Sequence, residues 1–180
     1  MTTIELDNKT HELPTSWDDV TVHEFQKIQT LLNSDMMDVT KSINIIALLL
    51  GVDVDTVEEF PISEFNKLQS EIMFISKAIV KPEDTEIIID DVEYIFKSDF
   101  GSDLTVGESI SLEMLNKSVK GNDTSSIISE TLCIFLRKKL EDGTTEKFKS
   151  SHMSRESMFG ELSITKVYYI ITSFTTGRNI

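Results

Sequence analysis

A short pattern that begins α-helices occurs twice in this chain, and it constrains the fold more than any other feature. Thr21 and Glu24 lie three positions apart in "VTVHEF", and Thr105 and Glu108 repeat this spacing in "LTVGES". In such a capping box, the threonine and glutamate side chains bond the free N–H groups of the first helical turn. The sequence therefore predicts two helices that begin in the same way.

The elements around the two capping boxes also recur in the same order. Each box follows a predicted β-hairpin, in residues 3–14 and 85–97, and each is followed by segments with apolar residues at helical spacing. A buried apolar helix is expected over residues 36–50, ending at Gly51. "KVYYIITSF" in the second half would also suit a strand, but its match to residues 62–76 predicts a helix.

These patterns predict an α+β fold that is mainly α and is built from two related units, residues 1–78 and 79–180. Each unit is a β-hairpin followed by a small antiparallel helical bundle. The second unit has an extra hairpin near 137–149, where Asp142-Gly143 predicts a tight turn. The alternative is that two amphipathic helices share a common cap by accident. The sequence leaves open whether the two units pack as one domain.

The charge of the chain limits its partners. Seventeen basic residues stand against 31 acidic ones, which gives a net charge of -14. Such a chain repels a phosphate backbone, so we expect no nucleic-acid partner. The most apolar segment, residues 43–52, has about half the roughly 20 residues that cross a bilayer, so we also expect no membrane insertion. The acidity serves solubility or docking on basic partner proteins.

The sequence contains no residue pattern that indicates catalysis, a cofactor or a metal. His11, His23 and His152 lack the spacing of metal ligands and are expected to be solvated surface side chains. Cys133 lies in an apolar run and is expected to pack as a small buried side chain. Phosphate-binding glycine loops and a serine nucleophile elbow are also missing from the sequence. We therefore expect a protein that is not an enzyme and binds no cofactor.

Trp17, the single tryptophan, comes just before the first capping box. It has two interpretations: packing onto the start of the first helix, or exposure as an anchor in a protein interface. Trp17 is therefore the candidate interaction residue. Thr21, Glu24, Thr105 and Glu108 are expected to be structural helix caps.

Four stretches of the chain resemble a known group of proteins. They are "LPTSWDDVTVHEFQKI", an apolar helix that ends in Leu-Leu-Gly, "DLTVGESISLEML" and "CIFLRKK". Together they resemble a diffuse group of small virion or tail-assembly-chaperone-like proteins of tailed bacteriophages, crAss-like phages in particular. The positions that match the motifs of the group are Trp17, Thr21, Glu24, Thr105, Gly107 and Glu108. The group tends to have an aromatic residue after the last of these, where this chain has Ser109.

The resemblance implies a non-enzymatic part in phage morphogenesis. The protein would be a structural or assembly component of the virion, in the head–tail connector, the tail or a capsid-associated part, and would be in the host cytoplasm during assembly. Its partners would be other phage structural proteins, with a homo-oligomeric ring as a further arrangement. Two alternatives stay open: a tail assembly chaperone absent from the mature particle, and an acidic inhibitor of a basic host protein.

Overall fold

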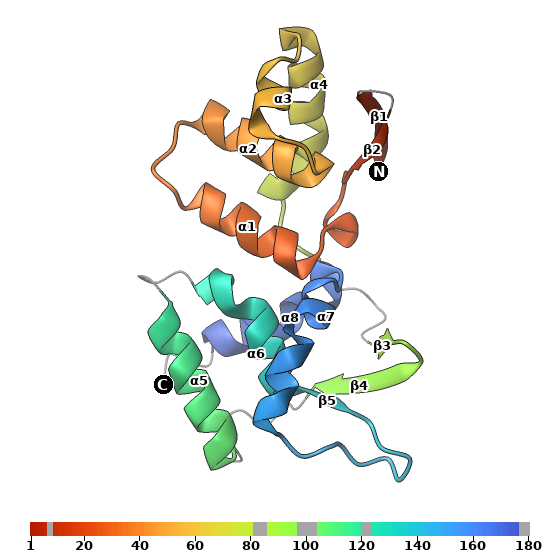
Figure 1. Cartoon of the computed structure of the whole chain (residues 1–180), viewed down its shortest axis with the longest axis vertical. Coiled ribbons are helices and arrows are strands. Elements are labelled where there is room, and N and C mark those ends of the chain that lie inside the picture. The colour runs from red at the N-terminus through yellow and green to blue at the C-terminus, as the bar shows by residue number, and fades with distance from the viewer. Residues whose placement is uncertain (7–8, 81–85, 97–103, 120–123, 177–180) are drawn as a thin grey trace.

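The computed structural model describes residues 1–6, 9–80, 86–96, 104–119 and 124–176, with the side chains of residues 171–176 excepted. The fold is α+β and mainly α, with two small antiparallel sheets, as predicted. In Figure 1 the elements form two lobes, one above the other. The first half of the chain forms the upper lobe and the second half the lower one.

The first lobe contains a hairpin and a set of helices. Its elements are β1 (Thr2–Leu6), β2 (Lys9–Leu13), the 3-10 turn η1 (Trp17–Asp19), α1 (Val22–Leu32), α2 (Asp38–Leu50), α3 (Val54–Glu58), α4 (Ile62–Glu71) and the 3-10 helix η2 (Ile72–Ser76). Two residues of the expected hairpin turn, 7–8, lie outside the described residues. Gly51 ends α2 with a φ of 65°, a left-handed conformation that glycine adopts at little cost.

The second lobe repeats the order of hairpin and capped helix, and then departs from it. Its elements are β3 (Ile87–Ile89), β4 (Val92–Phe96), α5 (Val106–Ser118), η3 (Thr124–Ile127), α6 (Ile128–Phe135), β5 (Leu136–Lys138), η4 (Ser150–Arg155), α7 (Glu156–Gly160) and α8 (Ile164–Thr176). Asp90 and Asp91 both have positive φ, as a two-residue hairpin turn requires. The helix expected for "KVYYIITSF" is confirmed as part of α8.

The extra hairpin expected near 137–149 is present in short form. Its first arm, β5, pairs with β4 and makes a three-stranded sheet in the order β3-β4-β5. The return arm is joined to it by the bridge between Lys139 and Thr145 and by two backbone hydrogen bonds. The Leu140 N–H donates to the Thr144 carbonyl over 2.8 Å, and the Glu146 N–H donates to the Lys138 carbonyl over 3.0 Å. The tight turn is present, since Gly143 has a φ of 79°. The free edge of β4 offers unpaired backbone groups, and β5 satisfies them.

Both predicted capping boxes are confirmed. The Thr21 N–H donates to Glu24 Oε2 over 2.8 Å, and the Glu24 N–H donates back to Thr21 Oγ1 over 3.2 Å. At the start of α5, Thr105 and Glu108 make the same two bonds, at 2.7 and 3.3 Å. Each pair satisfies N–H groups that have no partner within the helix.

Buried apolar residues of both lobes belong to one continuous core. Backbone hydrogen bonds join the lobes where the start of α1 lies antiparallel to the start of α8. The Val22 N–H donates to the Leu162 carbonyl, and the Ile164 N–H donates to the Val20 carbonyl, each over 2.9 Å. Helix α1 therefore links the lobes. That the two units are repeats of one another stays a prediction.

The helix α5 is attached to the second lobe by a buried ion pair. Glu108 is the one residue of α5 that is buried. Its Oε1 accepts a 2.8 Å hydrogen bond from Nη2 of Arg137 on β5, and both side chains are 2% exposed. Arg137 Nη1 also donates to the Cys133 carbonyl, and the guanidinium lies 5.0 Å from the centre of the Phe148 ring. Burial lowers the pKa of Arg137, and Glu108 opposes this shift.

The two cap glutamates differ in burial and partners, which makes them a matched pair of substitutions. We expect Glu24→Ala to lower the free energy of unfolding by about 1 kcal/mol, since it removes a cap. Glu108→Ala also leaves the Arg137 guanidinium buried without its carboxylate, which costs about 3–5 kcal/mol. Urea unfolding followed by circular dichroism measures both. Equal losses for the two variants would show that the buried pair adds nothing to stability.

Candidate binding groove

The sequence-selected residues lie in three separate places. Trp17 is 7% exposed, and its Nε1 donates to the Lys77 carbonyl over 3.0 Å. Its ring makes edge contacts with Phe25 and Phe74, with ring centres 5.5 and 5.2 Å away. The interpretation of Trp17 as an exposed interface anchor is therefore wrong, because the ring fastens η1 to α1 and η2 inside the core. The two capping boxes lie at the starts of different helices, α1 and α5.

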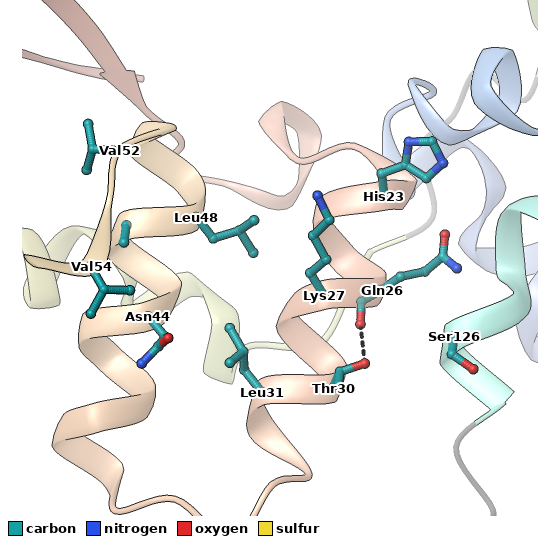
Figure 2. Close-up of a pocket in the computed structure, with 11 residues that line it drawn as sticks. His23, Gln26, Lys27, Thr30, Leu31, Asn44, Leu48, Val52, Val54 and Ser126 are labelled. Atoms are coloured by element: carbon teal, nitrogen blue, oxygen red, sulfur yellow. Dashed lines mark hydrogen bonds between the residues drawn. The ribbon is translucent and has the colours of Figure 1, made fainter. Parts of the chain in front are cut away.

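An open groove of about 620 Å³ runs along α1. Figure 2 shows α1 between α2 on one side and Ser126 of η3 on the other. From α1 the groove is lined by His23, Gln26, Lys27, Thr30 and Leu31. The wall formed by α2, the turn after it and the start of α3 is mostly apolar, with Ala47, Leu48, Val52 and Val54 beside Asn44.

The ionisable side chains of the groove are basic, although the chain is strongly acidic. The two ionisable residues that line it, His23 and Lys27, are both basic, although the chain as a whole has a net charge of -14. Gln26 is buried, and its Oε1 has no hydrogen-bond partner within the described part of the chain. The groove thus combines an apolar wall with cationic groups and one unsatisfied acceptor.

His23 connects the groove to the second lobe. Its Nε2 lies 2.6 Å from Oε1 of Glu156 on α7, and its Nδ1 lies 3.4 Å from Oε1 of Glu161. Ser129 of α6 donates to the same Glu156 oxygen over 2.7 Å. Gly160 leaves room for the imidazole, because a Cβ at this position would overlap the His23 ring. The expectation that His23 is a solvated surface side chain is therefore wrong.

The environment of His23 favours its charged form. Burial alone would lower the pKa of His23, but the hydrogen bond and charge of Glu156, followed by those of Glu161, raise it above its ordinary value. Burial opposes ionisation of Glu156 as well, yet the hydrogen bonds from His23 and Ser129 lower the pKa of this carboxyl. The pair joins α1 to α7, and each partner favours the charged form of the other.

A second group of charged side chains lies beside the three-stranded sheet. Hydrogen bonds from Arg155 lower the pKa of Glu146 to about 2 against the effect of burial. His152 is 5% exposed, with its Nε2 3.5 Å from Glu146, so the expectation of a solvated His152 is also wrong. Burial lowers the pKa of His152. These residues hold the segment after β5 against the sheet.

Cys133 is buried as predicted. Burial, followed by the charges of Glu156 and Glu130, raises the pKa of its thiol to about 12. Because the thiolate is the reactive form of cysteine, this thiol is unreactive at neutral pH. In the part of the chain that the structure describes, no group of three or more His, Cys, Asp or Glu side chains is arranged to hold a metal ion.

Among the described helices, none has the length and apolar character needed to cross a membrane.

Comparison of the chain with protein-family models, with curated proteins and with solved structures finds no match.

Sequence patterns did not single out the groove. Most of the residues that line it from α1 are polar, and on an amphipathic helix polar side chains normally face water. Nothing local distinguishes His23 or Gln26 from such a solvated face. The sequence does show two basic residues, His23 and Lys27, in an acidic chain. They indicate a groove only once the structure places the apolar wall beside them.

The His23 ion pair predicts a dependence of stability on pH. A histidine with a pKa raised above the unfolded value of about 6.5 stabilises the fold below that pH, and this stabilisation is lost as the pH rises through the raised pKa. We expect the difference in free energy of unfolding between wild type and His23→Gln to shrink from pH 6 to pH 9. Urea unfolding at a series of pH values measures it.

The titration of His152 has the opposite sign, because its pKa is lowered. His152 is present in wild type and in His23→Gln, so its titration cancels from the difference between their free energies of unfolding. Glu156 stabilises the fold at pH values above its ordinary pKa. This stabilisation is lost only in acid, as the pH falls through the lowered pKa of Glu156. If the free energies of unfolding of wild type and His23→Gln differ by the same amount at pH 6 and pH 9, the raised pKa of His23 is contradicted.

Gly160 and His23 are predicted to be coupled. Gly160→Ala displaces the imidazole, and overpacking of this kind costs about 1–3 kcal/mol. The same substitution in a His23→Ala background meets no ring, so we expect it to cost much less. The coupling energy of this double-mutant cycle, obtained from urea unfolding, should exceed about 1 kcal/mol. Additive effects of the two changes would contradict the close contact.

Proposed function

We propose that this protein is a non-enzymatic structural or assembly protein of a tailed bacteriophage, which binds structural proteins of the particle, further copies of itself included. The resemblance of the segments around Trp17, Thr21 and Thr105 to small virion and tail-assembly proteins supports the phage context. The observation that carries the binding role is the open groove along α1, with its apolar wall and cationic side chains.

The groove has the features of a site for a helix or an extended segment of another protein. Apolar surface on Leu48, Val52 and Val54 gains free energy when a partner covers it, by about 25 cal/mol for each Å² removed from water. Lys27 fixes the orientation of the partner through a polar contact. Amphipathic helices bind to grooves of this type through side chains spaced three or four residues apart.

The two other candidate functions differ in what they require of the groove. A tail assembly chaperone would use the groove for a transient complex and leave before the particle is complete. An acidic inhibitor would bind a basic host protein, and the cationic His23 and Lys27 make this groove a poor site for such a partner. The groove therefore favours binding to phage proteins over inhibition of a basic host protein.

Mass spectrometry of gradient-purified particles of the encoding phage tests this proposal. We expect peptides of the protein to remain with the particle through purification, in a constant ratio to the capsid protein. Its presence in the infected lysate together with its loss from purified particles would favour the chaperone and contradict a structural role.

A phage that encodes the Lys27→Glu, Thr30→Glu variant tests the groove itself. Both side chains are exposed on α1, so the change alters the groove without touching the core. We expect purified particles to contain less of this variant than of wild type. Ile62→Glu is the control, because Ile62 is exposed on α4 and does not line the groove. Equal incorporation of all three proteins would contradict binding through the groove.

A further inference from the structure

Helix α5 presents an apolar ridge to solvent. Val106, Ile110 and Met114 are 76%, 53% and 68% exposed. They are spaced four residues apart and lie on one face of the helix. Within α5 the buried residue is Glu108, so the helix is held to its own lobe through a charged side chain. An aligned row of exposed apolar side chains of this kind marks an interaction surface.

The ridge and the groove have the same length. From Val106 to Met114 the ridge covers eight residue steps, or about 12 Å of helix. The part of α1 that lines the groove runs from His23 to Leu31 and is also about 12 Å long. A helix laid along α1 can therefore place its three apolar side chains against the apolar wall of the groove.

The charges of the two surfaces are complementary. Glu113 lies at the edge of the ridge, seven residues after Val106 on nearly the same side of the helix, and is 65% exposed, whereas the groove supplies Lys27. In the free protein Glu113 binds Lys117 over 2.6 Å, but an exposed pair of this type contributes little and is easily exchanged. Two copies of a chain with a net charge of -14 repel each other overall. The opposite charges of Glu113 and Lys27 make this pair of surfaces a favourable place for contact.

We propose that the ridge of α5 from one copy of the protein binds in the α1 groove of a second copy, with Glu113 facing Lys27. The contact joins two different surfaces of the same chain, so each copy has one ridge and one groove to offer. Contacts of this heterologous kind build a ring when the rotation between copies closes, and a filament when it does not. This inference rests on the proposed function, since it names the partner of the same groove.

Sedimentation velocity of the full chain over a range of concentrations tests the contact. We expect wild type to self-associate. A ridge variant, Ile110→Glu with Met114→Glu, and a groove variant, Lys27→Glu with Thr30→Glu, should each raise the dissociation constant by about tenfold or more. All four substituted side chains are exposed, so folding is preserved, and circular dichroism verifies it. Ile62→Glu, an exposed apolar residue on α4, should leave association unchanged.

A mixture of the two variants is the decisive sample. The ridge variant keeps an intact groove and the groove variant keeps an intact ridge, so we expect the mixture to form dimers and no larger species. Ridge-to-ridge packing predicts instead that the groove variant associates like wild type. A monomeric wild type at 100 μM, on the order of 10⁻⁴ M, or a mixture that stays monomeric, would overturn the proposal.

Ionic strength provides a second readout. Salt screens the repulsion between two strongly acidic chains, while apolar burial persists. We expect association of wild type to strengthen between 50 mM and 500 mM NaCl, concentrations at which the screening length falls from roughly 14 Å to 4 Å. Weakening over this range would show that attraction between charges dominates and would overturn an apolar contact. Retention of the protein in particles despite a monomeric wild type would reject this inference and keep the proposed function.

Discussion

The first turn of α1 is the constraint on which the rest of the structure depends. It is held from three sides: the capping box satisfies its own N–H groups, backbone hydrogen bonds tie it to the start of α8, and His23 ties it to α7. Behind it, Phe25 packs on Trp17. A helix that must meet all these partners has one possible position, and that position sets both the packing of the lobes and the shape of the groove.

The second capping box shows how the same local signal serves a different purpose. Glu24 closes a cap at the junction of the two lobes, whereas Glu108 closes a cap and also neutralises the buried Arg137. The ion pair helps to anchor α5, together with the partly buried Leu112 and Leu115, while Val106, Ile110 and Met114 stay exposed. Its apolar ridge is therefore available to another molecule, which explains why a stable helix has Ile110 and Met114 in solvent.

Local patterns predicted those parts of the fold that local chemistry determines. Capping boxes at Thr21 and Thr105, the left-handed Gly51 and the hairpin turn at Asp90-Asp91 follow from a few neighbouring residues each. Pairing between distant segments could not be read in this way. The addition of β5 to β4 and the contact of His23 with Glu156 depend on how the lobes meet. Burial of Trp17 depends equally on η2, some 60 residues away in the chain.

The position of His23 links the groove to the contact between the lobes. His23 lines the groove and at the same time binds Glu156, so its imidazolium is shared between a potential partner and the second lobe. An acidic group that binds near His23 favours its protonated form, and this is the form that holds α1 to α7. By thermodynamic linkage, binding of an acidic group near His23 and protonation of His23 must then strengthen each other to the same degree. The acidic residues that face His23 from α7 and its C-terminal end thus limit how much anionic charge a partner can bring, which favours an apolar helix with a single carboxylate over a highly acidic segment.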